Sequence, residues 1–561
     1  MNEKLIVASC LSHALDGALH EERILALLEQ PKHAIHGDLA FPCFELAKTL
    51  RKSPAGIASE LANTLQHKLV SHVEAVGPYV NFFLHRHIVS NTVLTHILDE
   101  RNRYGNLAIG DGQHVPIDLS SPNIAKPFSM GHLRSTVIGN AIANIMAKCD
   151  YKPIKINYIG DWGTQFGKLI VAYKKWGSPE QIKQTPIKEL LKLYVHFHKE
   201  AEKYPALEDE GRAWFKKLED GNEEAHHLWG WFRSESLIEF NKIYDLLGIS
   251  FDSTNGEAFY NDKMDEIVTL LEEAHLLIED NGAQVVMLEE PLPPCLIKKS
   301  DGATLYATRD IAAALYRKRT YNFAQAIYVV GGEQRLHFQQ LFAVLQKLGF
   351  DWAKNMIHVP FGMILKDGKK MSTRKGKVVL LEEVLTEAIH MATQNITEKN
   401  PALTKKEVVA RQVGVGAVIF HDLKNDRMNN IEFSLEDMLK FEGETGPYVQ
   451  YSYARACSIL RKASHTPGQA TIQLEDDLSW TIVKLLHHFP TIIQQAHDKL
   501  EPSIIAKYVV DLSQAFNTYY GNVHIMIEDE QLQSRLVLVE AVAIVLKEGL
   551  RLLGIAAPEE M

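Results

Sequence analysis

The feature that most constrains this chain is a strand–loop–helix pattern that occurs twice, far apart in the sequence. Residues 115–120 form a short apolar run, a polar loop follows, and 132–148 carry apolar side chains at helical spacing before a second apolar run at 154–160. Residues 325–349 repeat the order of strand, Gly-Gly turn and helix. Strands joined through a helix in this way build nucleotide-binding sheets. The sequence therefore predicts an α/β Rossmann-type sheet whose two halves are separated by a long stretch of chain.

The rest of the chain divides into segments of different character. The stretch between the two patterns is rich in charge and in amphipathic helix, and we interpret it as an insertion. The first residues indicate a small α+β module, in which a helix capped by Ser53 precedes a strand that begins after a Gly-Pro turn. The C-terminal part carries long apolar helical stripes. We predict an N-terminal domain at 1–105, a catalytic domain at 106–385 with an insertion at about 170–300, a helical connector at 386–430 and an all-α helical bundle at 431–561.

Composition narrows the class of protein. The five cysteines are scattered without a C-x-x-C pair, which favours a reducing cytoplasm over a disulfide framework or a structural zinc site. We expect no signal peptide and no membrane span, because charge interrupts every apolar run. The net charge of −10 disfavours a general nucleic-acid coat protein. It leaves room for a specific RNA binder with a local basic surface, and residues 366–377 hold six Lys or Arg in twelve positions.

The loop between the first strand and its helix has the chemistry of a phosphate site. A helix N-terminus presents unpaired N–H groups and the positive end of the helix dipole. Gly131 lets the backbone approach a ligand, His132 can donate to a phosphate oxygen, and Lys126 adds a charge nearby. Ser129 precedes them in an S-x-G-H order. Taken alone, a Gly-His pair is more often a polar loop with a capping histidine; the order of strand, lysine and helix favours phosphate binding here.

A second basic segment follows an expected strand at 358–365. Lys370 and Arg374 could neutralise charge that builds on a triphosphate in its transition state. The alternative is a solvated surface loop, which is the common fate of a run of charges. Neither segment contains a Walker A motif.

Together these segments resemble the HIGH and KMSK motifs of class I aminoacyl-tRNA synthetases, and their residues are similar to those of the arginyl-tRNA synthetase family. The N-terminal module resembles the additional domain of that family, and residues 446–462 resemble the opening of its anticodon-binding domain. The resemblance covers most of the chain and rests on five segments in order: SSPNIAKPFSMGHLRST at 120–136, GDWGTQFGKL at 160–169, DGATLYATRDIAAA at 301–314, YVVGGEQRLHFQQL at 328–341 and KMSTRKGKVV at 370–379.

The resemblance implies an ATP-dependent arginine–tRNA ligase that acts in the cytoplasm as a monomer, with ATP, Mg²⁺, arginine and an arginine tRNA as its ligands and no metal ion held by the protein. The residues expected to act in catalysis are His132, Lys126, Lys370 and Arg374. Those expected at ATP are Ser129, Gly131, His132, His337, Met371, Ser372 and Thr373. Those expected at arginine are Asp118, Ser120, Asn123, Tyr306, Asp310 and Gln334, and those at tRNA are Asn81, Phe83 and Tyr448.

Arginine presents a planar guanidinium with five donors, so its pocket needs fixed carboxylates. The resemblance implies that Asp310, with Asp118, holds this group, and that Asn123 and Gln334 take the α-amino and carboxylate end. Tyr306 and Asp310 are four apart and would share a helix face.

Several assignments keep an alternative. Without the family context, Asp310 would be an acid on a helix surface and His337 could simply pack. Trp162 is expected as a wall of the pocket. Phe83 could equally be a core strand position.

The chain departs from the family motifs at two positions. Ser129 stands where HIGH begins with His, and Thr373 stands where KMSK ends with Lys. We therefore expect the phosphate chemistry to depend more on Lys126, His132 and Arg374.

Three other functions remain open at this point. They are a nucleotidylyltransferase of the H-x-G-H superfamily, a synthetase for another amino acid and a catalytically impaired tRNA-binding paralogue. The helical module at 431–561 argues against the first, the two aspartates against the second, and pyrophosphate exchange would decide the third.

Overall fold

The chain divides into two compact units, each of which combines segments that are distant in sequence. The first unit consists of residues 1–104, 456–488 and 514–545, and the second of 105–455, 489–513 and 546–561. The computed structural model describes residues 3–31, 33–299, 306–366, 368–370, 379–464 and 472–561.

The N-terminal part of the first unit is the small α+β module that the sequence predicts. A three-stranded antiparallel sheet has the order β1 (Leu39–Pro42), β3 (Tyr79–Leu84), β2 (Val70–Val76). Ser53 caps α4 (Pro54–Thr64), where its Oγ accepts a hydrogen bond from the Gly56 N–H. Apolar side chains of the helices and of β3 share one core. The other helices are α1 (Glu3–Ala14), α2 (Glu21–Leu27), α3 (Leu46–Leu50) and α5 (Arg86–Glu100).

A parallel sheet forms the centre of the second unit and confirms the Rossmann-type prediction. Its order is β10 (Met356–Val359), β9 (Ala326–Val329), β4 (His114–Ser120), β5 (Lys152–Asn157). Helix α6 (Met130–Lys148) crosses from β4 to β5, and Gly139 lets it pack closely, because a Cβ there would lie 2.2 Å from Leu119 Cβ. β5 and β9 flank β4 in the sheet, and the chain between β5 and β9 contains the predicted insertion.

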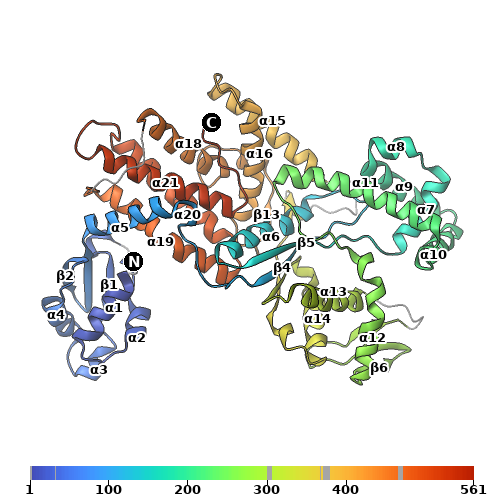
Figure 1. Ribbon diagram of the computed structural model, residues 1–561, viewed down its shortest axis with the longest axis horizontal. Coiled ribbons are helices and arrows are strands. Elements are labelled where there is room, and N and C mark those ends of the chain that lie inside the picture. The colour runs from blue at the N-terminus through green and yellow to red at the C-terminus, as the bar shows by residue number, and fades with distance from the viewer. Residues whose placement is uncertain (1–2, 32, 300–305, 367, 371–378, 465–471) are drawn as a thin grey trace. The chain divides into compact units, whose positions relative to one another are not determined.

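The insertion is mainly helical, as expected, and includes a small sheet that the sequence did not predict. Helices α7 to α10 gather beside one end of the long helix α11 (Figure 1). The antiparallel sheet β6–β7–β8 has strands of only four residues, too short to give a clear alternating pattern. The elements are α7 (Thr164–Trp176), α8 (Pro179–Gln184), α9 (Pro186–Ala201), α10 (Ala206–Glu219), α11 (Glu223–Leu247), α12 (Met264–Glu273), β6 (Leu277–Asp280), β7 (Ala283–Val286) and β8 (Cys295–Lys298). Helix α13 (Tyr306–Tyr321) leads into β9.

The single strand expected at 358–365 is wrong. β10 ends at Val359, and β11 (Ile364–Lys366) joins a different sheet with β12 (Lys369–Lys370) and β13 (Ile431–Glu432). Pro360 breaks the strand because it has no N–H to donate. Gly362 turns the chain against Asn429, whose carbonyl oxygen would lie 2.5 Å from a Cβ at that position.

The remainder of the described chain is helical. The apolar stripe predicted for the last helix is buried at the centre of that helix. Gly554 adopts the left-handed region, with φ of 74°, and ends the helix. None of the helices that the structure describes is both long and apolar enough to cross a membrane. The helices are α14 (Arg335–Lys347), α15 (Leu381–Lys399), α16 (Lys406–Leu423), α17 (Leu435–Met438), α18 (Gly446–Lys462), α19 (Asp477–Lys499), α20 (Ser503–Asn522) and α21 (Leu532–Leu552).

Candidate active site

The N-terminus of α6 holds its histidine in one tautomer. Ser129 is the N-cap, and its backbone N–H donates to Nδ1 of His132 at 3.1 Å. The proton of the neutral ring therefore lies on Nε2, which is left to donate to a ligand. Burial, with the charge of Lys126, lowers the pKa of His132 to about 4, so the ring is a neutral donor at physiological pH.

The other predicted residues of this segment leave the helix N-terminus accessible. Gly131 is exposed, and among the residues that the structure describes a Cβ there would meet only Ser129 Oγ, at 3.6 Å. Nζ of Lys126 lies 5.9 Å from the ring centroid of Tyr194 on α9. The segment therefore offers a backbone N–H surface, a neutral imidazole and a nearby cation.

The chain that follows the basic segment returns to this helix N-terminus. The Leu381 N–H donates to the carbonyl of Phe128 at 3.0 Å, and Leu380 forms an antiparallel bridge with Ser129. Lys370 ends β12, whose partner β11 positions the start of the segment. Met371, Ser372, Thr373 and Arg374 lie outside the described residues. The chain that immediately follows the KMSK-like segment therefore lies beside the HIGH-like segment.

A cavity of about 470 Å³ opens at the carboxyl edge of the parallel sheet, and we call it the acidic cavity. Five of the six residues expected at arginine line it, together with His337. Its lining comprises Asp118, Ser121, Asn123, Tyr158, Glu257, Tyr306, Asp310, Ala313, Arg317, Tyr328, Val330, Gln334, His337 and Phe338.

Ser120, the sixth residue expected at arginine, is buried and is not among the residues that line the acidic cavity. Its Oγ lies 2.9 Å from the Tyr244 hydroxyl and accepts from Thr136 Oγ1 at 3.2 Å, both away from the cavity. The register of β4 against β5 shifts between Asp118 and Ser120, which breaks the alternation that would have put the two side chains on one side. The neighbouring Ser121 lines the cavity instead.

Among the residues that the structure describes, the side-chain partners of Asp310 in the cavity are a hydroxyl and an imidazole. Its Oδ1 accepts from the Tyr158 hydroxyl at 2.8 Å, and its Oδ2 lies 2.6 Å from His337 Nε2. Burial acts to lower the pKa of His337, but the hydrogen bond to Asp310 and the charge of Asp310 raise it above its ordinary value. His337, expected at ATP, thus lies with the residues expected at arginine.

Asp118 already has a guanidinium partner. Arg317 Nη2 donates to its Oδ2 at 3.0 Å, and both side chains are buried, with 3% and 7% exposed. Arg317 also lies over the rings of Tyr158 and Tyr328, at 5.3 and 5.6 Å from their centroids. The expectation that Asp118 holds the substrate guanidinium directly therefore gives way to a supporting position for this acid.

Glu257, which was not predicted from the sequence, reaches the acidic cavity from the insertion. It begins a 3-10 helix (Glu257–Lys263), and Arg309 Nη1 lies 3.8 Å from its carboxylate. Burial raises the pKa of Glu257 to about 7, against the effect of Arg309 and with the effect of the nearby Asp310. No local pattern marks Glu257. Arg317 could have been found, because it lies two helical turns after Asp310 on the same face.

Trp162 is not a wall of this cavity. Its ring packs edge-on against Phe215 and Trp229, at centroid distances of 5.6 and 5.8 Å. Those partners lie on α10 and α11, so Trp162 fixes the strand end to the insertion.

Two of the residues expected at tRNA lie on β3 of the first unit, and their environments differ. Asn81 is only 2% exposed, so its side chain is not available to a macromolecule in this conformation. Phe83 is half-buried and stacks on His72 with ring centroids 4.0 Å apart, while Phe82 takes the core position. The core alternative for Phe83 is therefore wrong. Tyr448, the third, is half-buried in the first turn of α18 in the second unit.

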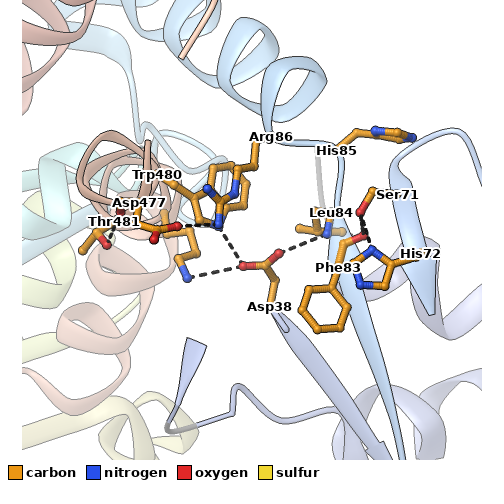
Figure 2. Close-up of a pocket in the computed structure, with 11 residues that line it drawn as sticks. Asp38, Ser71, His72, Phe83, Leu84, His85, Arg86, Asp477, Trp480 and Thr481 are labelled. Carbon is orange, nitrogen blue, oxygen red and sulfur yellow. Dashed lines mark hydrogen bonds and ion pairs between the residues drawn. The ribbon is translucent and has the colours of Figure 1, made fainter. Parts of the chain in front are cut away.

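Phe83 lines a second cavity, of about 320 Å³, shown in Figure 2. Arg86 at the start of α5 pairs with Asp477 at 2.7 Å, and Trp480 Nε1 donates to Asp38 at 2.8 Å. Its cations are therefore paired with acids, whereas its aromatic stack is left half-exposed.

Three family models match the chain in order. The model described as arginyl tRNA synthetase N terminal domain matches residues 6–84, that of tRNA synthetases class I (R), catalytic domain, matches 93–435, and that of the DALR anticodon binding domain matches 449–561.

Similar proteins and structures agree with these models. The chain is 62% identical, over the full length of both, to a protein of Enterococcus faecalis named arginine–tRNA ligase, and 62% identical to arginine–tRNA ligase 2 of Bacillus anthracis, again over both full lengths. The structure of the Thermus thermophilus arginyl-tRNA synthetase superposes with a TM-score of 0.82 at 27% identity and covers both chains completely. That of the Plasmodium falciparum enzyme shares the fold, with a TM-score of 0.79 at 23% identity and 99% of each chain covered.

Proposed function

Because the chain belongs to the arginine–tRNA ligase family of class I aminoacyl-tRNA synthetases, we propose that it activates arginine with ATP and transfers the arginyl group to the 3′ end of an arginine tRNA. The observation that carries the choice of amino acid is the acidic cavity, in which Asp310 and Glu257 approach one space from different elements. Two carboxylates match the forked donors of a guanidinium, which an ammonium group cannot reproduce.

At the other end of the amino acid, Asn123 and Gln334 are the polar side chains that can hold the α-amino and carboxylate groups. Tyr306 supplies a hydroxyl on the face of α13 that it shares with Asp310. Asp118 and Arg317 support the floor of the cavity. With the guanidinium held at Asp310 and Glu257 and the α-amino and carboxylate groups at Asn123 and Gln334, the substrate carboxylate would face the loop that precedes α6.

The start of α6 is the proposed site of the ATP phosphates. His132 donates through Nε2, the helix N-terminus offers its N–H groups, and Lys126, Lys370 and Arg374 supply positive charge. Ser129, Gly131 and residues 371–373 complete the proposed ATP site. With Ser129 as the N-cap, the serine acts by fixing His132 instead of donating beside it.

The reaction needs no protein nucleophile. A carboxylate oxygen of arginine attacks the α-phosphorus of ATP, the bond to the β-phosphate oxygen breaks, and pyrophosphate leaves. The terminal ribose hydroxyl of the tRNA then attacks the arginyl carbonyl, loses its proton, and AMP leaves. Positioning and electrostatic stabilisation supply the acceleration.

Mg²⁺ would accompany ATP in this proposal. Among the residues that the structure describes, no three His, Cys, Asp or Glu side chains are arranged to hold a metal ion. The ion would therefore be held mainly by the phosphates, where it screens their charge.

The remaining parts of the proposal concern tRNA and the cell. We propose that residues 431–561 bind the anticodon arm, that residues 1–105 meet the D-loop near the half-buried Phe83 on β3, and that 386–430 connect the helical bundle to the catalytic domain at 106–385. We also propose a cytoplasmic monomer.

Arginine-dependent exchange of pyrophosphate into ATP, measured with and without an arginine tRNA transcript, tests the proposal. We expect exchange with arginine and none above background with lysine, followed by transfer of labelled arginine to the transcript. A protein that binds the transcript but exchanges no pyrophosphate would be the catalytically impaired paralogue, and exchange that does not depend on arginine would favour a nucleotidylyltransferase.

A further inference from the structure

We propose that Arg233, on helix α11 of the insertion, is a positioning residue for arginine recognition. Through the buried carboxylate of Asp161 it fixes the turn that carries Glu257 into the acidic cavity. The inference rests on the proposed function, since it takes Glu257 to meet the substrate guanidinium. It gives the insertion a part in amino acid selection, although neither phosphate-binding segment belongs to it.

Asp161 joins three parts of the second unit. Its side chain is 1% exposed, and its Oδ2 accepts from Arg233 Nε at 2.8 Å. Its Oδ1 accepts from the backbone N–H of Ala258 at 2.8 Å, and its carbonyl accepts from Trp229 Nε1 at 2.7 Å. A buried carboxylate held by a cation on one side and a backbone N–H on the other is fixed in direction, because each hydrogen bond is charge-assisted.

The turn at 254–258 packs directly against the Asp161 carboxylate. Arg233 Nη2 also donates to the carbonyl of Thr254 at 3.2 Å, and the Glu257 N–H donates to the carbonyl of Ile159 at 3.0 Å. A Cβ on Gly256 would lie 2.6 Å from both carboxylate oxygens of Asp161. The turn therefore contacts Asp161 directly, and its position depends on where that carboxylate is held.

Loss of Arg233 should weaken the binding of arginine in the acidic cavity more than the binding of the ATP phosphates. Asp161 would become a buried acid without its cation, and the Ala258 contact that fixes the turn would weaken. The carboxylate of Glu257 would then move relative to Asp310, and a planar guanidinium tolerates little change in such a pair. No described contact connects this turn to His132 or Lys126, so the ATP side should be unaffected.

The test measures steady-state pyrophosphate exchange by the full chain. We expect Arg233→Met to raise the KM for arginine by about ten-fold, the equivalent of one charge-assisted hydrogen bond, and to leave the KM for ATP within about two-fold. Arg233→Lys should recover part of the effect, since Nζ can still reach Asp161 but not Thr254 as well. Arg212→Met is the matched control, because it removes an exposed ion pair with Asp209 on α10 of the same insertion.

Glu257→Gln completes a double-mutant cycle. If Arg233 acts through Glu257, Arg233→Met should change the KM for arginine by less than about two-fold in the Glu257→Gln background. Additive effects, or equal rises in the KM for arginine and for ATP, would overturn the inference. Should Arg233→Met fail to fold, Asp161→Asn provides the same test, since it keeps the acceptor for the Ala258 N–H and removes the charge that Arg233 pairs with. It should also raise the KM for arginine and leave the KM for ATP unchanged. Wild-type protein without arginine-dependent exchange would refute the proposed function instead.

Discussion

The acidic cavity and the N-terminus of α6 lie along the same sheet, but they are built in different ways. In the cavity each acid takes its partner from another element, as Asp310 does from Tyr158 and Asp118 from Arg317. At the start of α6 the hydrogen bond that matters, between Ser129 and His132, joins residues three apart. The cavity is therefore a mutually dependent network, whereas the helix start is a local motif.

This difference has consequences for substitutions. In a network, the removal of one partner leaves another buried polar group unsatisfied, so effects are large and not additive. At a local motif, the loss should be limited to the interaction that the side chain makes with the ligand.

The largest effect is expected for Arg317→Met, which leaves Asp118 as a buried carboxylate without its cation. We expect the free energy of unfolding to fall by about 3–5 kcal/mol, as urea denaturation would measure. Arg319→Met is the control, because its ion pair with Glu266 on the surface is about half-exposed and should contribute less than about 1 kcal/mol.

The double variant Arg317→Met/Asp118→Leu sharpens this prediction. It removes both charges, so much of the lost stability should return. Equal losses in the single and double variants would show that Arg317 matters through packing on the tyrosine rings and not through the charge of Asp118.

The next largest effect is expected for Asp310→Ala on the KM for arginine. Loss of two charge-assisted hydrogen bonds to a guanidinium should raise the KM for arginine by roughly a hundred-fold or more and change the KM for ATP by less than about three-fold. Pyrophosphate exchange at varied concentrations of each substrate measures both. Similar rises in the two KM values would remove Asp310 from arginine recognition.

His132→Ala should give a smaller and more local effect. One neutral donor to a phosphate is expected to contribute about ten- to a hundred-fold in kcat for exchange, with the KM for arginine unchanged. Because the contacts of the His132 ring are local, with Ser129 at the helix cap and Phe128 beside it, this loss and that of Asp310→Ala should add. Strong non-additivity would mean that the helix start belongs to the same network as the cavity.

The same contrast explains what the sequence could predict. The Rossmann-type sheet, the capped α4 and the start of α6 follow from signals within about twenty residues. The strand break at Pro360 and the register shift before Ser120 were missed because they depend on which sheet or helix receives the chain. Asp118, which the resemblance implies at arginine, does line the cavity, but its pairing with Arg317 joins residues far apart in sequence. Glu257 could not be found at all, because only the folded insertion brings it to Asp310.

The smallest predicted effect is the pH dependence of arginine binding. His337 has its pKa raised by Asp310, so its positive charge persists to higher pH than for an ordinary histidine, and its protonated form opposes a second cation at Asp310. Glu257, with its pKa raised to about 7 by burial, loses negative charge over the same range as pH falls. Both changes weaken arginine binding in acid, so the KM for arginine should rise several-fold as pH falls from about 8 to about 6, while the KM for ATP should change less. In His337→Asn the remaining inflection should be that of Glu257, and an unchanged profile in this variant would mean that His337 does not titrate against the substrate.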